Sequence, residues 1–284
     1  MMKRMIILLA INVSILLPAM ERIQDTSKQD LFITATQKGM VDTMQHLKHE
    51  GVDPSVALHM TVRNGLVKSV SQLLAMGANP NALNKSNETP LVYMLKKFVA
   101  ADYCDVDCCC CCGCHQNLKM ADGTSYRYEV SPRVDEAEKI AQKLLESGAS
   151  AQIGNPLAYA ISIGWKKMVP LLIKHGASVH EVVYEDGRGA LAASCGSWSR
   201  CDCCKSIVTT LLKAGAVIDH KDTNGETALF KACKYHNVSI MKMLVKAGAN
   251  VHIKNNAGKS ILETAVTHGN EGHVNLLKKY GASL

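Results

Sequence analysis

The pair Gly-Ala recurs every 33 residues near the end of the chain, at Gly215, Gly248 and Gly281. Before each of the last two pairs, the sequence runs through the same parts: a polar turn, a short apolar helix pattern, a second turn and a second helix pattern. A pair of short helices cannot bury its apolar faces alone, so each pair must stack on its neighbours. The period therefore predicts an all-α solenoid rather than a domain built around one central core.

Several residues at fixed places in this period have a clear physical role. Gly225 and Gly258 complete polar turns and permit the positive φ of a tight bend. Thr227 and Ser260 stand where a side-chain oxygen can cap the first helix of a pair. Gly248 is placed to end the second helix in a left-handed conformation. Each pair should therefore begin at a cap and end at a glycine.

The best-preserved repeat resembles an ankyrin repeat. Asp222, Gly225, Thr227 and Leu229 match the D-x-x-G-x-T-x-L part of that motif, whereas Ala228 and Phe230 replace the Pro and His of T-P-L-H. Thr89-Pro90-Leu91 is the best T-P-L match in the chain. The resemblance implies a stack of helix pairs with turns, called fingers, along one edge. It also implies a non-catalytic protein that binds other proteins through finger tips and first helices. The resemblance does not identify any individual binding residue in this chain.

Glycine marks divide the remaining chain into about seven helix pairs. The marks are Gly51, Gly77, Gly148, Gly176, Gly215, Gly248 and Gly281. Two pairs are interrupted between their helices, by a long insertion at Val99–Arg133 and a shorter one at Ser197–Cys203. Pro156 should fall in the first turn of a helix, where proline is tolerated. Pro170 should either kink its helix or also fall in a first turn. We therefore expect a repeat domain over residues 30–284 with two inserted loops.

The N-terminus has the features of a secretory signal peptide over residues 1–20. Lys3 and Arg4 precede the apolar run Met5–Leu17, and Pro18 and Ala19 follow it. The run is shorter than the ~20 apolar residues of a membrane span. We expect export, to a periplasm or to the outside of the cell, and a linker over residues 21–29. The alternative is an uncleaved membrane anchor over residues 5–20, which is the one way in which we expect a membrane to be involved.

Cysteines gather in and around the two insertions. The first holds Cys104, Cys108–Cys112 and Cys114, and the second is flanked or filled by Cys195, Cys201, Cys203 and Cys204. Cys111-x-x-Cys114 and Cys201-x-x-Cys204 have the spacing of a metal knuckle, so Cys111, Cys114, Cys201 and Cys204 are candidate ligands of one tetrahedral zinc ion. Disulfides between the insertions are the rival interpretation in an oxidising compartment. A third interpretation is that the cysteines lie in a low-complexity loop and have no defined bonding partners. Cys233, inside a helix pattern, is expected to be a small core residue.

Composition narrows the function further. The formal charge of +7 is spread along the chain without a dense Lys/Arg run, and three Phe and two Trp offer little base-stacking surface, so we expect no nucleic-acid partner. No catalytic arrangement is evident, and we expect no enzyme and no cofactor, apart from zinc if the cysteines bind metal. We expect a monomer that binds an unidentified protein, and a host-directed effector is one role for such an exported chain. A metal-binding or thiol-redox protein using the cysteine insertions is the alternative.

Overall fold

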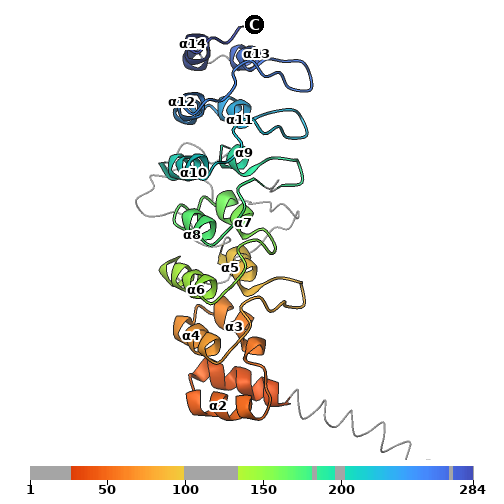
Figure 1. The fold of residues 1–284 in the computed structure, drawn as a ribbon, viewed down its shortest axis with the longest axis vertical. Coiled ribbons are helices and arrows are strands. Elements are labelled where there is room, and N and C mark those ends of the chain that lie inside the picture. Colours follow the sequence, from red (N-terminus) through yellow and green to blue (C-terminus); the bar gives the residue numbers. More distant parts are fainter. Residues whose placement is uncertain (1–26, 99–133, 181–183, 196–201, 269–270, 284) are drawn as a thin grey trace, which may run out of the picture.

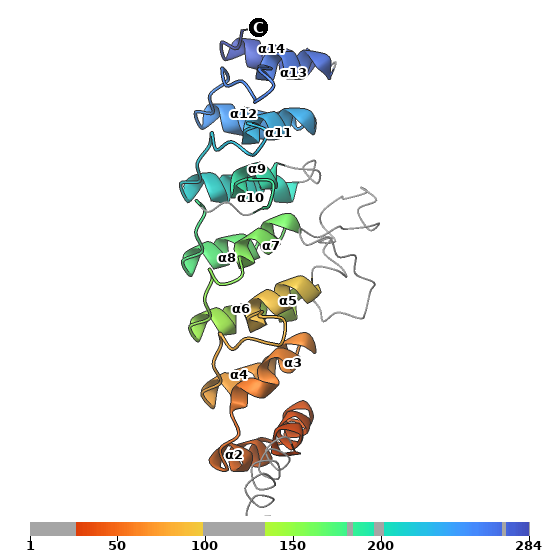
Figure 2. The same ribbon diagram turned by 90° about the vertical axis from the view of Figure 1, so that its right-hand side faces the viewer.

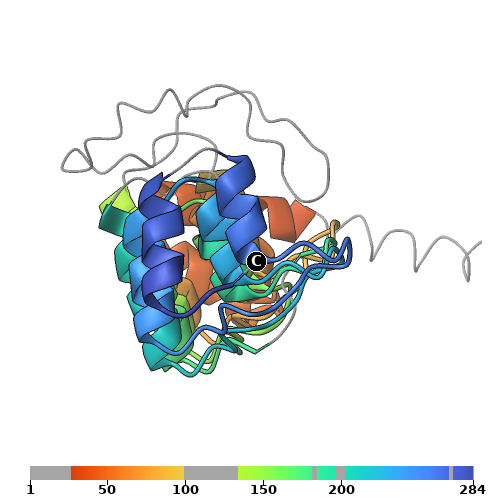
Figure 3. The ribbon, with the colours of Figure 1, turned by 90° about the horizontal axis from the view of Figure 1, so that it is seen from above.

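Helix pairs stack in two parallel columns in the computed structural model, which describes residues 27–98, 134–180, 184–195, 202–268 and 271–283 (Figure 1). The first helices form one column and the second helices form the other, and fingers project from the side of the first-helix column (Figures 1 and 3). Within the described residues no strand forms, although Lys254 and Ser260 pair as an antiparallel bridge in the last finger. This is the all-α solenoid that the 33-residue period predicts.

A helix over residues 27–38 begins the first-helix column. The column continues with α3 (Leu58–Arg63, preceded by the 3-10 turn η1, Pro54–Ala57), α5 (Pro90–Phe98), α7 (Pro156–Ser162), α9 (Ala190–Ser194), α11 (Ala228–Lys234) and α13 (Ile261–Thr267). The second-helix column holds α2 (Val41–His49), α4 (Val67–Ala75), α6 (Val134–Glu146), α8 (Met168–Lys174), α10 (Asp202–Lys213), α12 (Val238–Lys246) and α14 (Glu271–Lys279). From α3 and α4 onward, each helix packs on the next helix of its own column, which gives one continuous core.

The core confirms the sequence expectation for the apolar positions. Leu229 and Leu244 are buried at 1% and 0% exposure, at the interface of their own pair with its neighbours. Cys233 is fully buried, as expected of a small core residue. Each of the seven marker glycines has a φ between 82° and 97°, so each ends its second helix in the left-handed conformation that glycine adopts at little cost.

The capping predictions are half right. Ser260 forms a reciprocal capping box: its hydroxyl accepts the Glu263 amide at 3.1 Å, and the Glu263 carboxylate accepts the Ser260 amide at 2.5 Å. Thr227 is the N-cap of α11 by backbone conformation, but its hydroxyl makes no capping hydrogen bond. The residue that would complete a box there is Phe230, which has no acceptor to offer.

Two expected segments overlap helices of the structure. Residues 27–29, which we expected in a linker, are the first described residues and are helical. Helix α10 begins at Asp202, so the expected insertion Ser197–Cys203 overlaps the start of this helix. Pro170 lies in the first turn of α8, where its missing amide costs nothing, and Pro156 is the first residue of α7.

Some expectations fall outside the described residues, namely the signal peptide at 1–20 and the insertion Val99–Arg133. The described ends of α5 and α9, which lead into the two insertions, lie at the same edge of the stack (Figure 2). In the described part of the chain, none of the helices has the length and apolar character required to cross a membrane.

Candidate functional site

Equivalent positions of the first helices form a row beside the fingers. The row position lies four residues after the Thr or Ser that starts the first helix, or after its equivalent. From the N-terminal end it is occupied by His59, Tyr93, Tyr159, Ala193, Lys231 and Thr264. His59, Tyr93 and Tyr159 are half-buried, and we call these three side chains the aromatic row.

Contacts with finger residues hold the first part of the aromatic row. The His59 ring lies edge-on to Tyr93 with centroids 5.7 Å apart, and its Nε2 is 2.9 Å from the Glu88 carbonyl oxygen, which accepts a hydrogen bond. Burial lowers the pKa of His59, although the contact with Glu88 opposes this shift. The imidazole is therefore neutral near pH 7 and donates to the finger backbone.

Lys96 links the same finger to the next repeat. Its Nζ lies 2.8 Å from the Glu88 carboxylate and 5.4 Å from the centroid of the Tyr159 ring. Burial acts to raise the pKa of Glu88, but hydrogen bonds from Lys96 and Asn84 outweigh it and the pKa is lowered. Lys97, one residue on, places its Nζ 6.0 Å from the Tyr93 centroid. Both tyrosines thus carry an ammonium group over a ring face.

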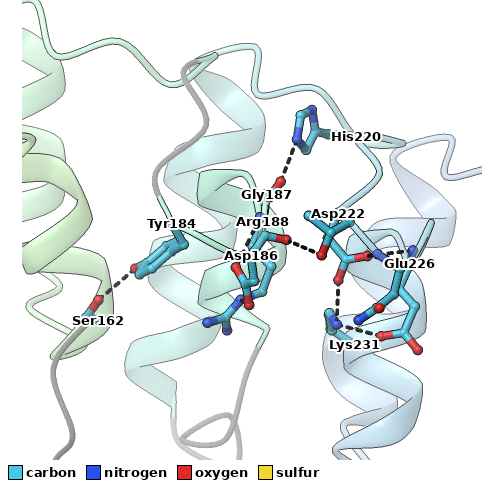
Figure 4. Close-up of polar contacts among 11 residues, drawn as sticks. Ser162, Tyr184, Asp186, Gly187, Arg188, His220, Asp222, Glu226 and Lys231 are labelled. Atoms are coloured by element: carbon cyan, nitrogen blue, oxygen red, sulfur yellow. Dashed lines mark hydrogen bonds and ion pairs between the residues drawn. The ribbon is translucent and has the colours of Figure 1, made fainter. Parts of the chain in front are cut away.

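Tyr184 lies next to the aromatic row, on its side toward the C-terminal repeats. Its hydroxyl is 2.7 Å from the Ser162 hydroxyl of α7 (Figure 4). The same hydroxyl donates to the Ala158 carbonyl at 3.1 Å. Burial raises the pKa of Tyr184 to about 12, so the phenol stays neutral. The Arg188 guanidinium lies 4.9 Å from the ring centroid and pairs with Asp186 at 2.5 Å.

Hydrogen bonds join the last three fingers into a ladder. The Thr223 amide donates to the Asp186 carbonyl at 3.1 Å, and the Asn256 amide donates to the Asn224 carbonyl at 2.9 Å. Gly225 has a φ of 74°, and a Cβ there would lie 2.4 Å from the Asn256 side chain, so no other residue fits without a shift. Neighbouring fingers are thereby held at a fixed spacing.

Three of the fingers are also braced internally in the same way. The side-chain oxygen of one Asp or Asn accepts two backbone amides, two and four residues further on. Asn84, Asp222 and Asn255 each do so, with distances between 2.8 and 3.1 Å. These turns therefore present their tips in a defined conformation.

Lys231 occupies the row position of α11 and is 8% exposed. Its Nζ lies 2.7 Å from the Asp222 carboxylate and 2.5 Å from that of Glu226 (Figure 4). Burial acts to lower the pKa of Lys231, but the two carboxylates outweigh it and the pKa is raised. This ion-pair cluster joins the finger to its own helix and keeps the lysine charged.

A small hollow lies between the finger segments that precede α9 and α11, next to Val179, Gly189 and His220. Its volume is about 10 Å³, no more than one water molecule requires.

The structure describes only some of the cysteines for which the sequence predicts a role. Among the candidate zinc ligands, Cys111, Cys114 and Cys201 lie outside the described residues. Cys204 is 5% exposed in α10, and Cys195 is fully buried at the end of α9, where burial raises the pKa of its thiol to about 12. In the described ranges no group of three or more His, Cys, Asp or Glu side chains is arranged to hold a metal. Zinc at Cys204 stays a prediction from spacing.

Sequence reasoning missed the aromatic row and the Lys231 cluster. His59, Tyr93 and Tyr159 have unequal spacings, because insertion and truncation alter the period between them. Counting four residues onward from each helix start would have found them. That register would have required Ser55 and Asn155 to be recognised as the positions equivalent to Thr227 and Ser260 in the later repeats.

Comparison with known proteins supports one family. A model described as "Ankyrin repeats (3 copies)" matches residues 199–284, and one described as "Ankyrin repeat" matches residues 55–85. No curated protein sequence matches the chain.

Solved structures resemble the chain in fold. The human ASB11 ankyrin repeat domain aligns with a TM-score of 0.58 at 21% identity, covering 89% of this chain and 98% of that one. The ankyrin repeat domain of Bcl-3 aligns with a TM-score of 0.64 at 19% identity, covering 87% of this chain and 97% of that one. An ankyrin repeat domain from Acinetobacter baumannii AYE aligns with a TM-score of 0.60 at 22% identity, covering 80% of this chain and 98% of that one. At such identities the likeness concerns the fold alone.

Proposed function

Because the chain is an ankyrin-repeat protein, we propose that it is a binding module for another protein, which docks across the fingers and first helices. Ankyrin repeats are in general interaction scaffolds without catalysis, and we propose no reaction for this chain. The observation that carries the proposal is the braced face described above. Rigid finger tips and half-buried tyrosines lie side by side along several repeats, and pre-organised groups of this kind reduce the entropy cost of association.

The opposite face provides a control for this proposal. The second helices carry exposed lysines such as Lys242, but no equivalent tyrosine row is present among their described residues. A protein partner should therefore contact position 264 of α13 and the fingertip at position 223, and should leave position 242 of α12 exposed.

Site-specific photo-crosslinking tests the binding face. A photoreactive amino acid is placed at position 223, 264 or 242 of the full chain. Each variant is expressed in the organism that naturally produces the protein. We expect a crosslinked adduct with a second protein from positions 223 and 264 and none from position 242. Adducts from position 242 alone would overturn the proposal, as would the absence of adducts from all three positions.

We also propose that the chain is exported after removal of its N-terminal segment. The support is the order of Lys3, Arg4, the apolar run and Ala19 in the sequence. Mass spectrometry of the native protein should find a chain that starts near Glu21. A chain that begins at Met1 in a soluble cytosolic fraction would contradict export, and one that begins at Met1 in a membrane fraction would support the anchor over residues 5–20.

A further inference from the structure

We propose that the edge of the stack formed by the C-terminal ends of α8, α10, α12 and α14 binds the surface of a membrane that contains anionic phospholipids. This is a second function, separate from the protein-binding face, and it requires no membrane-spanning segment. The inference starts from one residue type that occupies the same position in four consecutive repeats.

Each of these four second helices ends at a lysine, two residues before a marker glycine. The four residues, which we call the lysine ladder, are Lys174, Lys213, Lys246 and Lys279. The helices pack on one another in order, so their C-terminal ends share one edge of the stack, opposite the ends of α5 and α9 that lead into the insertions (Figure 2). Packed helices lie about 8–10 Å apart, so the ladder extends over about 30 Å.

Little negative charge accompanies the ladder. The residues around it are 170–180, 209–219, 242–252 and 275–283, and they carry six lysines, the other two being Lys242 and Lys278. The same ranges contain one carboxylate, Asp219, so their net charge is +5, and this carboxylate accepts the Asn250 amide at 3.1 Å. All six lysines are exposed, and none of them forms an ion pair within the described part of the chain.

The first three repeats lack this excess. Their corresponding residues, 45–55, 71–81 and 142–152, carry two lysines against three carboxylates, a net of −1. Lys174 and Lys279 are 105 residues apart in the sequence, so only stacking gathers the ladder on one edge. The positive surface is therefore a property of the C-terminal four repeats.

The helix dipole alone does not account for the pattern. A cation near a helix C-terminus is stabilising, yet α4 ends at Ala75 and α6 ends at the acidic Glu146. In α12, Lys242 and Lys246 are four residues apart, a spacing at which like charges destabilise a helix. Attraction to an external anionic surface gives the additional lysine a role that the dipole does not.

A membrane fits the ladder better than a nucleic acid or an acidic protein segment. Lipid headgroups diffuse within the bilayer and can meet lysines at whatever spacing the repeats impose, whereas the charges of a polymer have fixed spacings. The cations include no arginine for bidentate phosphate contacts, and among Phe, Trp and Tyr the four ranges contain only Tyr280, too little for base stacking. Tyr280 is 37% exposed next to Lys279, and tyrosine is enriched at membrane–water interfaces.

Vesicle flotation with the full chain tests the proposal. One set of vesicles is phosphatidylcholine alone, and the other contains about one-third phosphatidylglycerol, which gives the surface a negative potential. We expect about tenfold or more tighter binding to the anionic vesicles, and we expect this binding to weaken as salt is added.

Neutralising variants locate the site. K213Q/K246Q removes the two central lysines of the ladder and should weaken binding to the anionic vesicles about twenty-five-fold, at about fivefold per lysine. The matched control K221Q/K254Q removes the exposed finger lysine that follows each of them by eight residues, and should change binding less than about twofold. Both variants have the same net charge and the same N-terminal segment, and circular dichroism melts verify that both fold.

Several results would overturn the proposal. They are no binding to the anionic vesicles, equal binding to both kinds of vesicle, and equal weakening by the two double variants. Displacement from the vesicles by a DNA duplex or by polyglutamate, at a lower concentration of anionic groups than phosphatidylglycerol vesicles require, would assign the ladder to a different polyanion. None of these results changes the crosslinking expected from positions 223 and 264, so the proposed function is tested separately.

Discussion

At the scale of single residues, the buried ion pairs determine how the fingers attach to the helices. Lys231 contacts two carboxylates, and the side chain of Asp222 is only 1% exposed. The ion pairs themselves add little net stability, because burying the charges costs free energy. The main effect of the lysine is that the buried carboxylates are not left without a cation.

Replacing Lys231 with methionine should therefore be costly. We expect Lys231→Met to lower the free energy of unfolding by about 3 kcal/mol, because Asp222 and Glu226 would remain without a cation. Lys234→Met, three residues along the same helix at an exposed position, should change it by less than about 0.5 kcal/mol. Urea unfolding of the two variants is the measurement, and equal midpoints would show that the cluster is solvated.

A second residue-scale feature is the histidine group at the end of the stack. His273 is fully buried in α14, and its ring stacks on His236 with centroids 5.6 Å apart, while His268 lies 6.0 Å from His236. Burial lowers the pKa of His273, and the neighbouring charges of His236 and His268 lower it further.

This shift predicts that the last repeat weakens in mild acid. The unfolded chain takes up a proton at His273 near pH 6.5, whereas the folded chain does so only at lower pH, so the stabilisation is present above pH 6.5 and is lost as pH falls below it. We expect His273→Leu to reduce this pH dependence in thermal melts between neutral pH and mild acid. His252→Gln, an exposed finger variant, should not. An unchanged pH profile in His273→Leu would assign the effect to other groups.

At the scale of elements, stability comes from the stacking of helices rather than from any single helix. The described first helices are short, and α9 has only five residues, far below the length at which an isolated helix is stable in water. Neighbouring pairs must supply the stabilisation, and Leu244 lies in such an interface at 0% exposure.

Leu244→Ala should accordingly cost about 2–5 kcal/mol of unfolding free energy, the range for buried leucine truncations. Lys242→Ala, exposed on the same helix, is the control and should cost less than about 0.5 kcal/mol. A loss below about 0.5 kcal/mol for Leu244→Ala in urea melts would mean that the register of α12 is wrong.

At the scale of the whole molecule, the helix pairs form the stack through contacts between their own residues, on both sides of the longer insertion. Helices α5 and α6 pack on each other directly, although Val99–Arg133 lies between them in the sequence. Helices α11 and α12 make the same kind of pair with a connection of three residues, Tyr235 to Asn237.

Deleting Val99–Arg133 and closing the gap with a two-residue turn should therefore leave the solenoid folded. Both helices keep their apolar faces, and a shorter loop costs less closure entropy. We expect unchanged helical content per repeat and a cooperative melt by circular dichroism, and the loss of any zinc that the full chain binds. An unfolded deletion variant would show that the cysteine segment stabilises the stack.

The solenoid itself could be predicted because its determinants are local and periodic. The glycines at the helix ends, the capping box of Ser260 and the buried leucines all follow from residues within one repeat. The expected linker and the shorter expected insertion overlap helices at residues 27–29 and at Asp202, since helix ends depend on packing against neighbours as well as on capping residues.

By itself, then, the sequence determined the class of fold, the order of the helix pairs and the residues that end them, because these depend on contacts within about one period of the chain. Only the tertiary structure decided which side chains share a surface. Tyr93 and Tyr159 are 66 residues apart, yet Lys96 from the helix of the first lies over the ring of the second. Stacking brings equivalent positions of successive repeats together whatever the length of chain inserted between them, so the residues of the aromatic row are not separated by one constant period.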